Sequence, residues 1–183
     1  QVLSDGETSG DFLEQVFADG GTAGFSNGFL VLGRIALWDE RRGRTWLTTL
    51  LEADVPGRTR AAFDAALSLS GQTAHSPLGQ VLSVVLERAG TPEVAIELER
   101  LVPWETVSLR EIGLWAVRAV LDAMPTDCER EASVRERGTW QEKAVKRLTD
   151  LGRRDEALTA AEEAVAHFRT LVATSPDAYS LDL

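Results

Sequence analysis

Residues 140–183 carry the clearest pattern of hydrophobic and polar positions in the chain. Before Gly152, apolar side chains recur at helical spacing, and after it a longer series follows the i, i+3, i+4 pattern of an amphipathic helix. Small alanines in the second series allow a neighbouring helix to approach closely. The pattern predicts two packed helices joined by a tight turn at Gly152. The apolar positions are Ala144, Val145, Leu148 and Leu151, then Ala157, Leu158, Ala161, Ala164, Val165, Phe168, Leu171 and Val172.

Prolines and glycines divide the rest of the chain into further helical segments. The six prolines stand between apolar-periodic segments, because proline fits poorly inside a helix. Gly20 to Gly24 is expected to form a loop, with Ser26 or Asn27 as the N-cap of the next helix. Ser76-Pro77 and Thr91-Pro92 are N-cap and first-turn pairs. Helices are predicted at 10–18, from this cap to 38, at 44–53, 57–70, 77–88, 92–101 and 106–123, and from a cap at Asp127 to Leu151, followed by the last helix.

Two of these segments, 29–38 and 81–87, are also rich in residues that favour strands. Their flanks lack the alternation and the tight hairpin turns that a sheet requires, so helices are favoured over the strand alternative. We therefore predict an all-α fold of about nine helices in roughly antiparallel pairs. Trp38 and Trp115 lie on apolar stripes and are expected in the core.

The final hairpin resembles the tetratricopeptide repeat (TPR) family. Gly152 and the run Asp155-Glu156-Ala157 lie where TPR turns often carry similar residues, and Ala161 and Ala164 match further small packing positions. Val145 and Leu148 replace the glycine and tyrosine that are usual in the family. Pro176 comes late, which implies a lengthened second helix. The resemblance implies a bacterial TPR-like α-solenoid of stacked hairpins. On this interpretation 1–183 is a single helical-repeat domain, with degenerate hairpins over 1–125 and the TPR-like hairpin over 126–183.

The same resemblance implies where a partner binds. In the family, the first helix of each hairpin lines a concave groove. When Ala157 is aligned with the small residue early in the second helix, the groove positions fall on one short set of polar residues. This set lacks the paired asparagine and lysine of the carboxylate clamps that hold chaperone tails. A peptide segment or a partner protein is therefore expected, with its chemistry left open, at Thr139, Glu142, Lys146, Thr149 and Asp150.

Charge and cysteine content narrow the class of partner and the setting. The net charge of -10 argues against nucleic acid and against anionic membranes, because both attract basic surfaces. No apolar run is long enough to span a membrane, and the N-terminus has no secretory signal layout. Cys128 is the only cysteine, which excludes an intrachain disulfide and a cysteine-based zinc site. A reducing, cytoplasmic setting is expected.

The sequence contains no recognisable catalytic, cofactor or metal motif. Gly20 to Gly24 lacks the lysine and hydroxyl residue that end a phosphate-binding loop. His75 and His167 have no neighbouring ligand at metal-binding spacing. We therefore expect a non-enzymatic interaction scaffold without a cofactor, in which open apolar ends favour self-association.

Two alternatives remain open. The first is a regulatory or oligomerising arm cut from a larger multidomain signalling NTPase. The start at Gln1 and the end within a segment of helical pattern are what such an excerpt would show. The other is an enzyme whose site is assembled from dispersed residues around Gly20 to Gly24 and His75.

Overall fold

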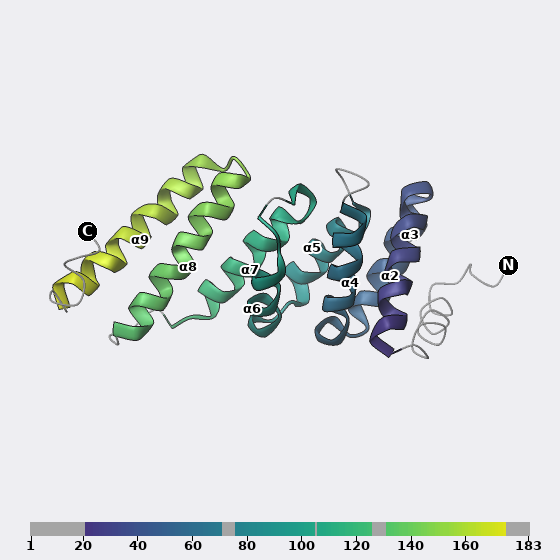
Figure 1. The fold of residues 1–183 in the computed structure, drawn as a ribbon, viewed down its shortest axis with the longest axis horizontal. Coiled ribbons are helices and arrows are strands. Elements are labelled where there is room, and N and C mark those ends of the chain that lie inside the picture. The colour runs from purple at the N-terminus through teal and green to yellow at the C-terminus, as the bar shows by residue number, and fades with distance from the viewer. Residues whose placement is uncertain (1–20, 71–75, 105, 126–130, 175–183) are drawn as a thin grey trace. The chain divides into compact units, whose positions relative to one another are not determined.

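The computed structural model describes residues 21–70, 76–104, 106–125 and 131–174, and all their regular structure is helical (Figure 1). These residues confirm the all-α prediction, and 29–38 and 81–87 are helices rather than strands. The helix expected at 10–18 and the cap at Asp127 lie outside the described residues. The elements are α2 (Gly21–Trp38), α3 (Glu40–Glu52), α4 (Val55–Ser70), α5 (Pro77–Ala89), α6 (Pro92–Leu101), the 3-10 turn η1 (Val107–Leu109), α7 (Arg110–Ala123), α8 (Glu131–Asp150) and α9 (Arg154–Thr174).

The contacts within the chain divide it into two compact units, Gln1–Ile112 and Gly113–Leu183. The first unit contains α2 to α6, η1 and the start of α7. The second contains the rest of α7 together with α8 and α9. The single repeat domain over 1–183 stays a prediction.

The core of the first unit forms where α2 packs against α3, α4 and α5. Phe29 of α2, Leu47 of α3, Phe63 of α4 and Leu82 of α5 are each fully buried. Burying one such side chain contributes about 1.5–3 kcal/mol, so these contacts dominate the stability of the unit.

Gly43 lies inside α3 and does not precede it, so the predicted helix start at 44 is wrong. Asp39 caps the helix instead, and its Oδ1 accepts a hydrogen bond from the backbone N–H of Arg42 at 3.1 Å. Gly43 is buried where a Cβ would lie 2.4 Å from the Cα of Ala36 in α2. The glycine therefore permits close packing of α2 and α3.

The expected glycine-rich loop is also wrong, because residues 21–24 form the first turn of α2. Ser26 and Asn27 consequently lie within the helix and do not cap it. Each glycine weakens a helix by about 1 kcal/mol relative to alanine, which is why the sequence favours a loop. Tertiary contacts oppose that preference: α2 packs against α4, and the Arg58 guanidinium lies 4.5 Å from the centre of the Phe25 ring.

Trp38 is 93% exposed, so the prediction that it belongs to the core is wrong. The buried face of α2 is set by Phe29, Leu32 and Ala36. Trp38 follows Phe29 by nine residues, which is two and a half helical turns, and it therefore points to the opposite side. Trp115, the other tryptophan expected in the core, is half-buried.

Two predicted helix starts are confirmed in detail. The Ser76 hydroxyl accepts from the N–H of Gly79 at 3.4 Å and begins α5, and the Thr91 hydroxyl accepts from the N–H of Val94 at 3.5 Å and begins α6. Both distances are long for N–H···O hydrogen bonds, so the caps are weak. In each case proline occupies the first helical position, where its missing N–H is not needed.

The second unit is built on an antiparallel pair, α8 and α9, which lie side by side along their length (Figure 1). Leu114 of α7, Leu148 of α8 and Ala157 of α9 meet in a small buried cluster, with Leu151 and Ala160 packed against it. The hairpin and its turn at Gly152 are therefore as predicted. The helix α9 continues to Thr174, in agreement with the lengthened second helix implied by Pro176.

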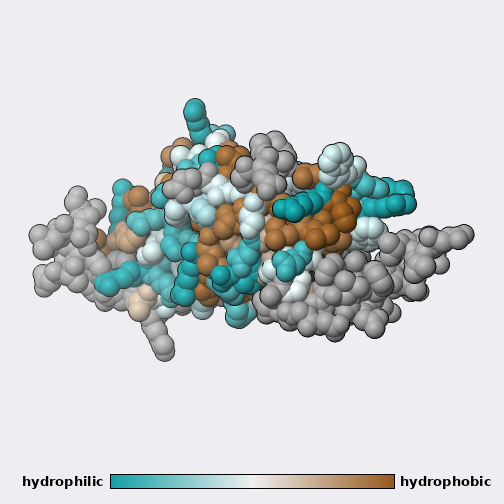
Figure 2. Space-filling model, turned by 45° about the vertical axis from the view of Figure 1, so that its right-hand side comes forward, coloured by the Kyte–Doolittle hydropathy of each residue, from teal (hydrophilic) through white to brown (hydrophobic). Residues whose placement is uncertain are grey.

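The apolar series on α9 is only partly buried. Ala157 and Ala164 are buried, whereas Leu158 is 62% exposed and Val165 is 45% exposed. On the face drawn in Figure 2, hydrophobic side chains reach the surface in several places between hydrophilic ones. The stripe is wider than the face that α8 covers, so part of it remains open to solvent.

Candidate functional site

The five positions implied by the TPR resemblance lie on one face of α8. They are spaced at i, i+3, i+7, i+10 and i+11, which places them on the same side of a helix. The opposite side carries the buried residues Gln141, Ala144 and Leu148. We call the five the outward face of α8: Thr139, Glu142, Lys146 and Thr149, which are exposed, and Asp150, which is half-buried.

The outward face is polar and carries both charges. The hydroxyls of Thr139 and Thr149 donate to the carbonyls of Arg135 and Val145 at 3.1 and 2.8 Å. A hydroxyl has one donor but two acceptor lone pairs, so both threonines retain acceptors for a ligand N–H. Together with a carboxylate and an ammonium group, this face can bind backbone and side-chain groups of a peptide. That it does so stays a prediction.

The turn after α8 fixes the position of this face. Gly152 has a φ of 74°, in the left-handed region that favours glycine. Its N–H donates to the carbonyl of Thr149, and the N–H of Arg153 donates to the carbonyl of Leu148, both at 2.9 Å. These two bonds are the Schellman pattern, which satisfies the last carbonyls of a helix. They let the chain reverse within a few residues, so α9 packs back against α8.

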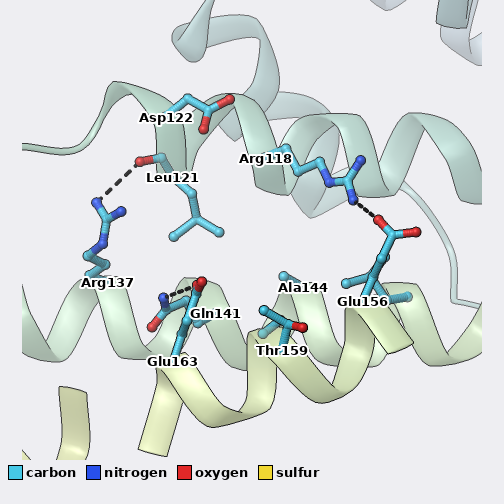
Figure 3. Close-up of a pocket in the computed structure, with 11 residues that line it drawn as sticks. Arg118, Leu121, Asp122, Arg137, Gln141, Ala144, Glu156, Thr159 and Glu163 are labelled. Carbon is cyan, nitrogen blue, oxygen red and sulfur yellow. Dashed lines mark hydrogen bonds and ion pairs between the residues drawn. The ribbon is translucent and has the colours of Figure 1, made fainter. Parts of the chain in front are cut away.

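A pocket of about 340 Å³ lies on the other side of α8, between α7 and the α8–α9 hairpin (Figure 3). Its volume is at the lower end of the range of about 300–1,000 Å³ that is typical of ligand pockets. All three helices contribute to its walls. It is lined by Arg118, Leu121 and Asp122 of α7, Arg137, Gln141, Ala144 and Leu148 of α8, and Glu156, Thr159, Ala160 and Glu163 of α9.

An ion pair closes one end of the pocket. Nη2 of Arg118 lies 2.6 Å from Oε2 of Glu156, and Figure 3 shows this contact bridging α7 and α9. Glu156 also accepts from Nε and Nη2 of Arg153 at 2.6 and 2.8 Å. The hydrogen bonds from Arg153 and then from Arg118 lower the pKa of Glu156 below its usual 4.5. The carboxylate is therefore held ionised between two guanidinium groups.

At the other end of the pocket, Arg137 of α8 caps the C-terminus of α7. Its Nη1 donates to the carbonyls of Leu121 and Met124, both at 3.3 Å. A cation is favourable at the C-terminus of a helix, because unpaired carbonyls and the helix dipole concentrate negative charge there. In Figure 3 the contact of Arg137 with Leu121 and the contact of Arg118 with Glu156 lie at opposite ends of the pocket, with the side chain of Leu121 between them.

A buried amide lies in the wall between these ends. Gln141 is only 3% exposed, and its Nε2 donates to Oε2 of Glu163 at 3.0 Å. Its Oε1 has no hydrogen-bond partner within the part of the chain that the structure describes. A buried acceptor without a partner costs about 1–3 kcal/mol. The sequence pattern alone could indicate that this side chain is buried, because Gln141 is a polar residue on the apolar stripe that continues through Ala144 and Leu148.

Among the other sequence candidates, only residues 21–24 and His167 are described by the structure. His75 and Cys128 lie outside the described residues, and residues 21–24 are helical. Nδ1 of His167 lies 2.7 Å from the backbone carbonyl of Glu163. Among residues 21–70, 76–104, 106–125 and 131–174, no cluster of three or more histidine, cysteine or acidic residues could hold a metal ion. In the same segments no helix is long and apolar enough to cross a membrane.

Comparison with known proteins finds no relative of this chain. No protein-family model, no curated protein and no solved structure matches the chain. The likeness to the TPR family therefore rests on the residues of the final hairpin.

Proposed function

We propose that this protein is a non-catalytic, TPR-like helical scaffold that docks a protein segment on the outward face of α8. The observation that carries the proposal is the placement of all five implied positions on one polar side of this helix, four of them exposed. The set from Thr139 to Asp150 spans about 16 Å at 1.5 Å per residue, enough for several residues of an extended peptide.

The packing of the second unit supports the stacked-hairpin part of the proposal. Helices α8 and α9 bury their facing sides against each other. Helix α7 packs on the same hairpin through a contact of Leu114 with Leu148 and Ala157. In a helical-repeat array each hairpin rests on a helix of the preceding one, which leaves one side of its first helix free for a ligand. The exposed outward face of α8 agrees with that arrangement.

The charge of the chain indicates the kind of segment that docks. A net charge of -10 attracts basic partners over long range and raises their rate of association. Glu142 and Asp150 supply local carboxylates, and Lys146 supplies one cation that sets register against an acidic or carbonyl group. We propose a protein segment that is basic overall.

A display library of linear peptides, selected on the intact chain, tests the proposal. The double variant Glu142→Ala/Thr149→Ala should weaken a selected peptide at least about tenfold, the effect of losing one or two charged or polar contacts. The matched control Glu162→Ala/Thr170→Ala removes the same residue types from exposed positions of α9 and should leave binding unchanged. Failure to select any specific peptide, or equal losses in both variants, would contradict the proposal.

The open stripe on α9 favours self-association as a second candidate function. Leu158 and Val165 are exposed and are seven residues apart, so they lie on the same side of the helix. Light scattering over a range of concentrations should reveal an oligomer that Leu158→Lys dissociates and Val84→Lys, at an exposed position of α5, does not. A chain that stays monomeric at every concentration would exclude this candidate.

A further inference from the structure

We propose that the pocket between α7 and the α8–α9 hairpin binds a basic side chain, lysine or arginine, of a protein partner. This goes beyond docking on the outward face of α8, because the pocket lies on the opposite side of that helix. Three properties of the pocket support it: its size, its apolar wall and the acceptors that remain in it.

The size and the wall fit a long aliphatic stem. About 340 Å³ accommodates one large side chain but not a folded segment. Leu121 of α7 and Ala144 of α8 form apolar parts of the wall (Figure 3), and Ala160 of α9 adds a third. Lysine and arginine bury their methylene groups along such surfaces and keep the charged end at a polar site.

The charges in the pocket favour a cation at that end. Its lining contains three carboxylates, on Asp122, Glu156 and Glu163, and two guanidinium groups, on Arg118 and Arg137. Both arginines already donate, one to Glu156 and the other to the C-terminal carbonyls of α7. The lining therefore contains more carboxylates than guanidinium groups. Both guanidinium groups already form contacts between helices.

Glu163 is the group against which the new cation would lie. Figure 3 shows Glu163 reaching from α9 toward Gln141 of α8, below Leu121 of α7. Its hydrogen bond comes from the amide of Gln141, which is neutral, so no positive charge compensates its carboxylate through that contact. An ammonium or guanidinium group at Glu163 would form a charge-assisted hydrogen bond.

The remaining hydrogen-bonding capacity of the pocket is that of acceptors. Oε1 of Gln141 is buried without a partner in the part of the chain that the structure describes, and Asp122 adds a further carboxylate to the lining. A ligand that supplies several N–H donors satisfies these atoms, whereas a carboxylate or phosphate supplies none. Lysine has three N–H donors and arginine has five, so both fit the acceptors available.

The probes are four blocked tripeptides with glycine on either side of lysine, arginine, norleucine or glutamate. Each is titrated into the full chain at constant ionic strength, and backbone and side-chain amide shifts are followed by NMR. We expect saturable shifts at the Gln141 side-chain amide and at Ala144, Ala160 and Glu163 with lysine, arginine or both. The comparison of these two probes identifies the preferred head group. Norleucine, which keeps the stem without the charge, and glutamate should not saturate the site.

Matched variants separate the pocket from the rest of the surface. Glu163→Gln should weaken the cationic probe about tenfold, and the neighbouring Glu162→Gln, which does not line the pocket, should not. Lys146→Ala removes a residue of the outward face and should leave the pocket shifts unchanged, so the two proposals can fail separately. Circular dichroism verifies that Glu163→Gln is folded. The proposal is overturned if neither cation produces saturable shifts at the pocket, if norleucine or glutamate matches them, or if Glu162→Gln weakens binding as much as Glu163→Gln.

Discussion

Replacing Gly152 by alanine tests the turn on which the final hairpin depends. Gly152 follows α8 with a φ of 74°, and a Cβ built on it meets nothing within 4 Å. Gly152→Ala therefore changes the backbone preference of one residue without a steric clash. The two hydrogen bonds of the turn, from Gly152 and Arg153, require the left-handed conformation to be kept.

The expected loss of stability follows from two opposing contributions. A residue with a Cβ costs about 1–2 kcal/mol in the left-handed region. Alanine also reduces the entropy of the unfolded chain relative to glycine, which offsets about 0.4–1 kcal/mol. We therefore expect Gly152→Ala to destabilise the hairpin by about 1 kcal/mol. Gly152→Asn should cost less, because asparagine tolerates this conformation better than alanine.

Amide hydrogen exchange measured by mass spectrometry reports the opening of α8 and α9 separately from the first unit. A loss of about 1 kcal/mol should speed exchange of the protected amides of the hairpin about fivefold. Gly90→Ala is the control, because Gly90 ends α5 with a φ of -71° that alanine adopts freely. Unchanged exchange in Gly152→Ala, or an equal effect of asparagine and alanine, would refute the argument from φ.

Two further substitutions test packing and electrostatics. Gly43→Ala should lower the midpoint of urea unfolding by the equivalent of about 1–3 kcal/mol, because the new Cβ would lie 2.4 Å from the backbone of Ala36. An unchanged midpoint would show that α2 and α3 separate easily. Glu156→Gln should destabilise the chain at neutral pH, because Arg153 and Arg118 lower the pKa of Glu156 and thereby stabilise the folded state above pH 4.5. As the pH falls through the folded pKa this stabilisation is lost, so unfolding midpoints of the variant and the native chain should converge in acid; a constant difference would contradict the ion-pair account.

Features that depend on local chemistry could be predicted from the sequence. Ser76-Pro77 and Thr91-Pro92 begin helices because their hydroxyls and prolines act within the first turn. The sequence predicts a turn at Gly152 because the apolar series on either side of it belong to two separate helices. The five positions of the outward face share a side of α8 because their spacing alone determines it.

Features that depend on tertiary packing could not be predicted in this way. Residues 21–24 and Gly43 look like helix breakers, yet they lie within helices, and at Gly43 the close approach of Ala36 in α2 leaves no room for a Cβ. Trp38 follows an apolar series but lies half a turn away from the buried side of its helix. In both cases the information missing from the sequence is which side of the helix meets a neighbour.

The pocket required the arrangement of three helices. Gln141 stands on an apolar stripe, which is a local signal for a buried polar group. Its partner Glu163 lies 22 residues further along the chain, and Leu121 comes from a third helix. No spacing rule joins such residues, so the pocket could be found only in the folded structure.

The central claim, docking of a protein segment on the outward face of α8, is tested most directly by site-specific photo-crosslinking. A benzophenone side chain is placed at position 146 of the full chain in one variant and at position 162 of α9 in another, and each is irradiated with the selected peptide. We predict a covalent adduct from position 146 and none from position 162. An adduct from position 162 alone, or from neither position, would contradict the account.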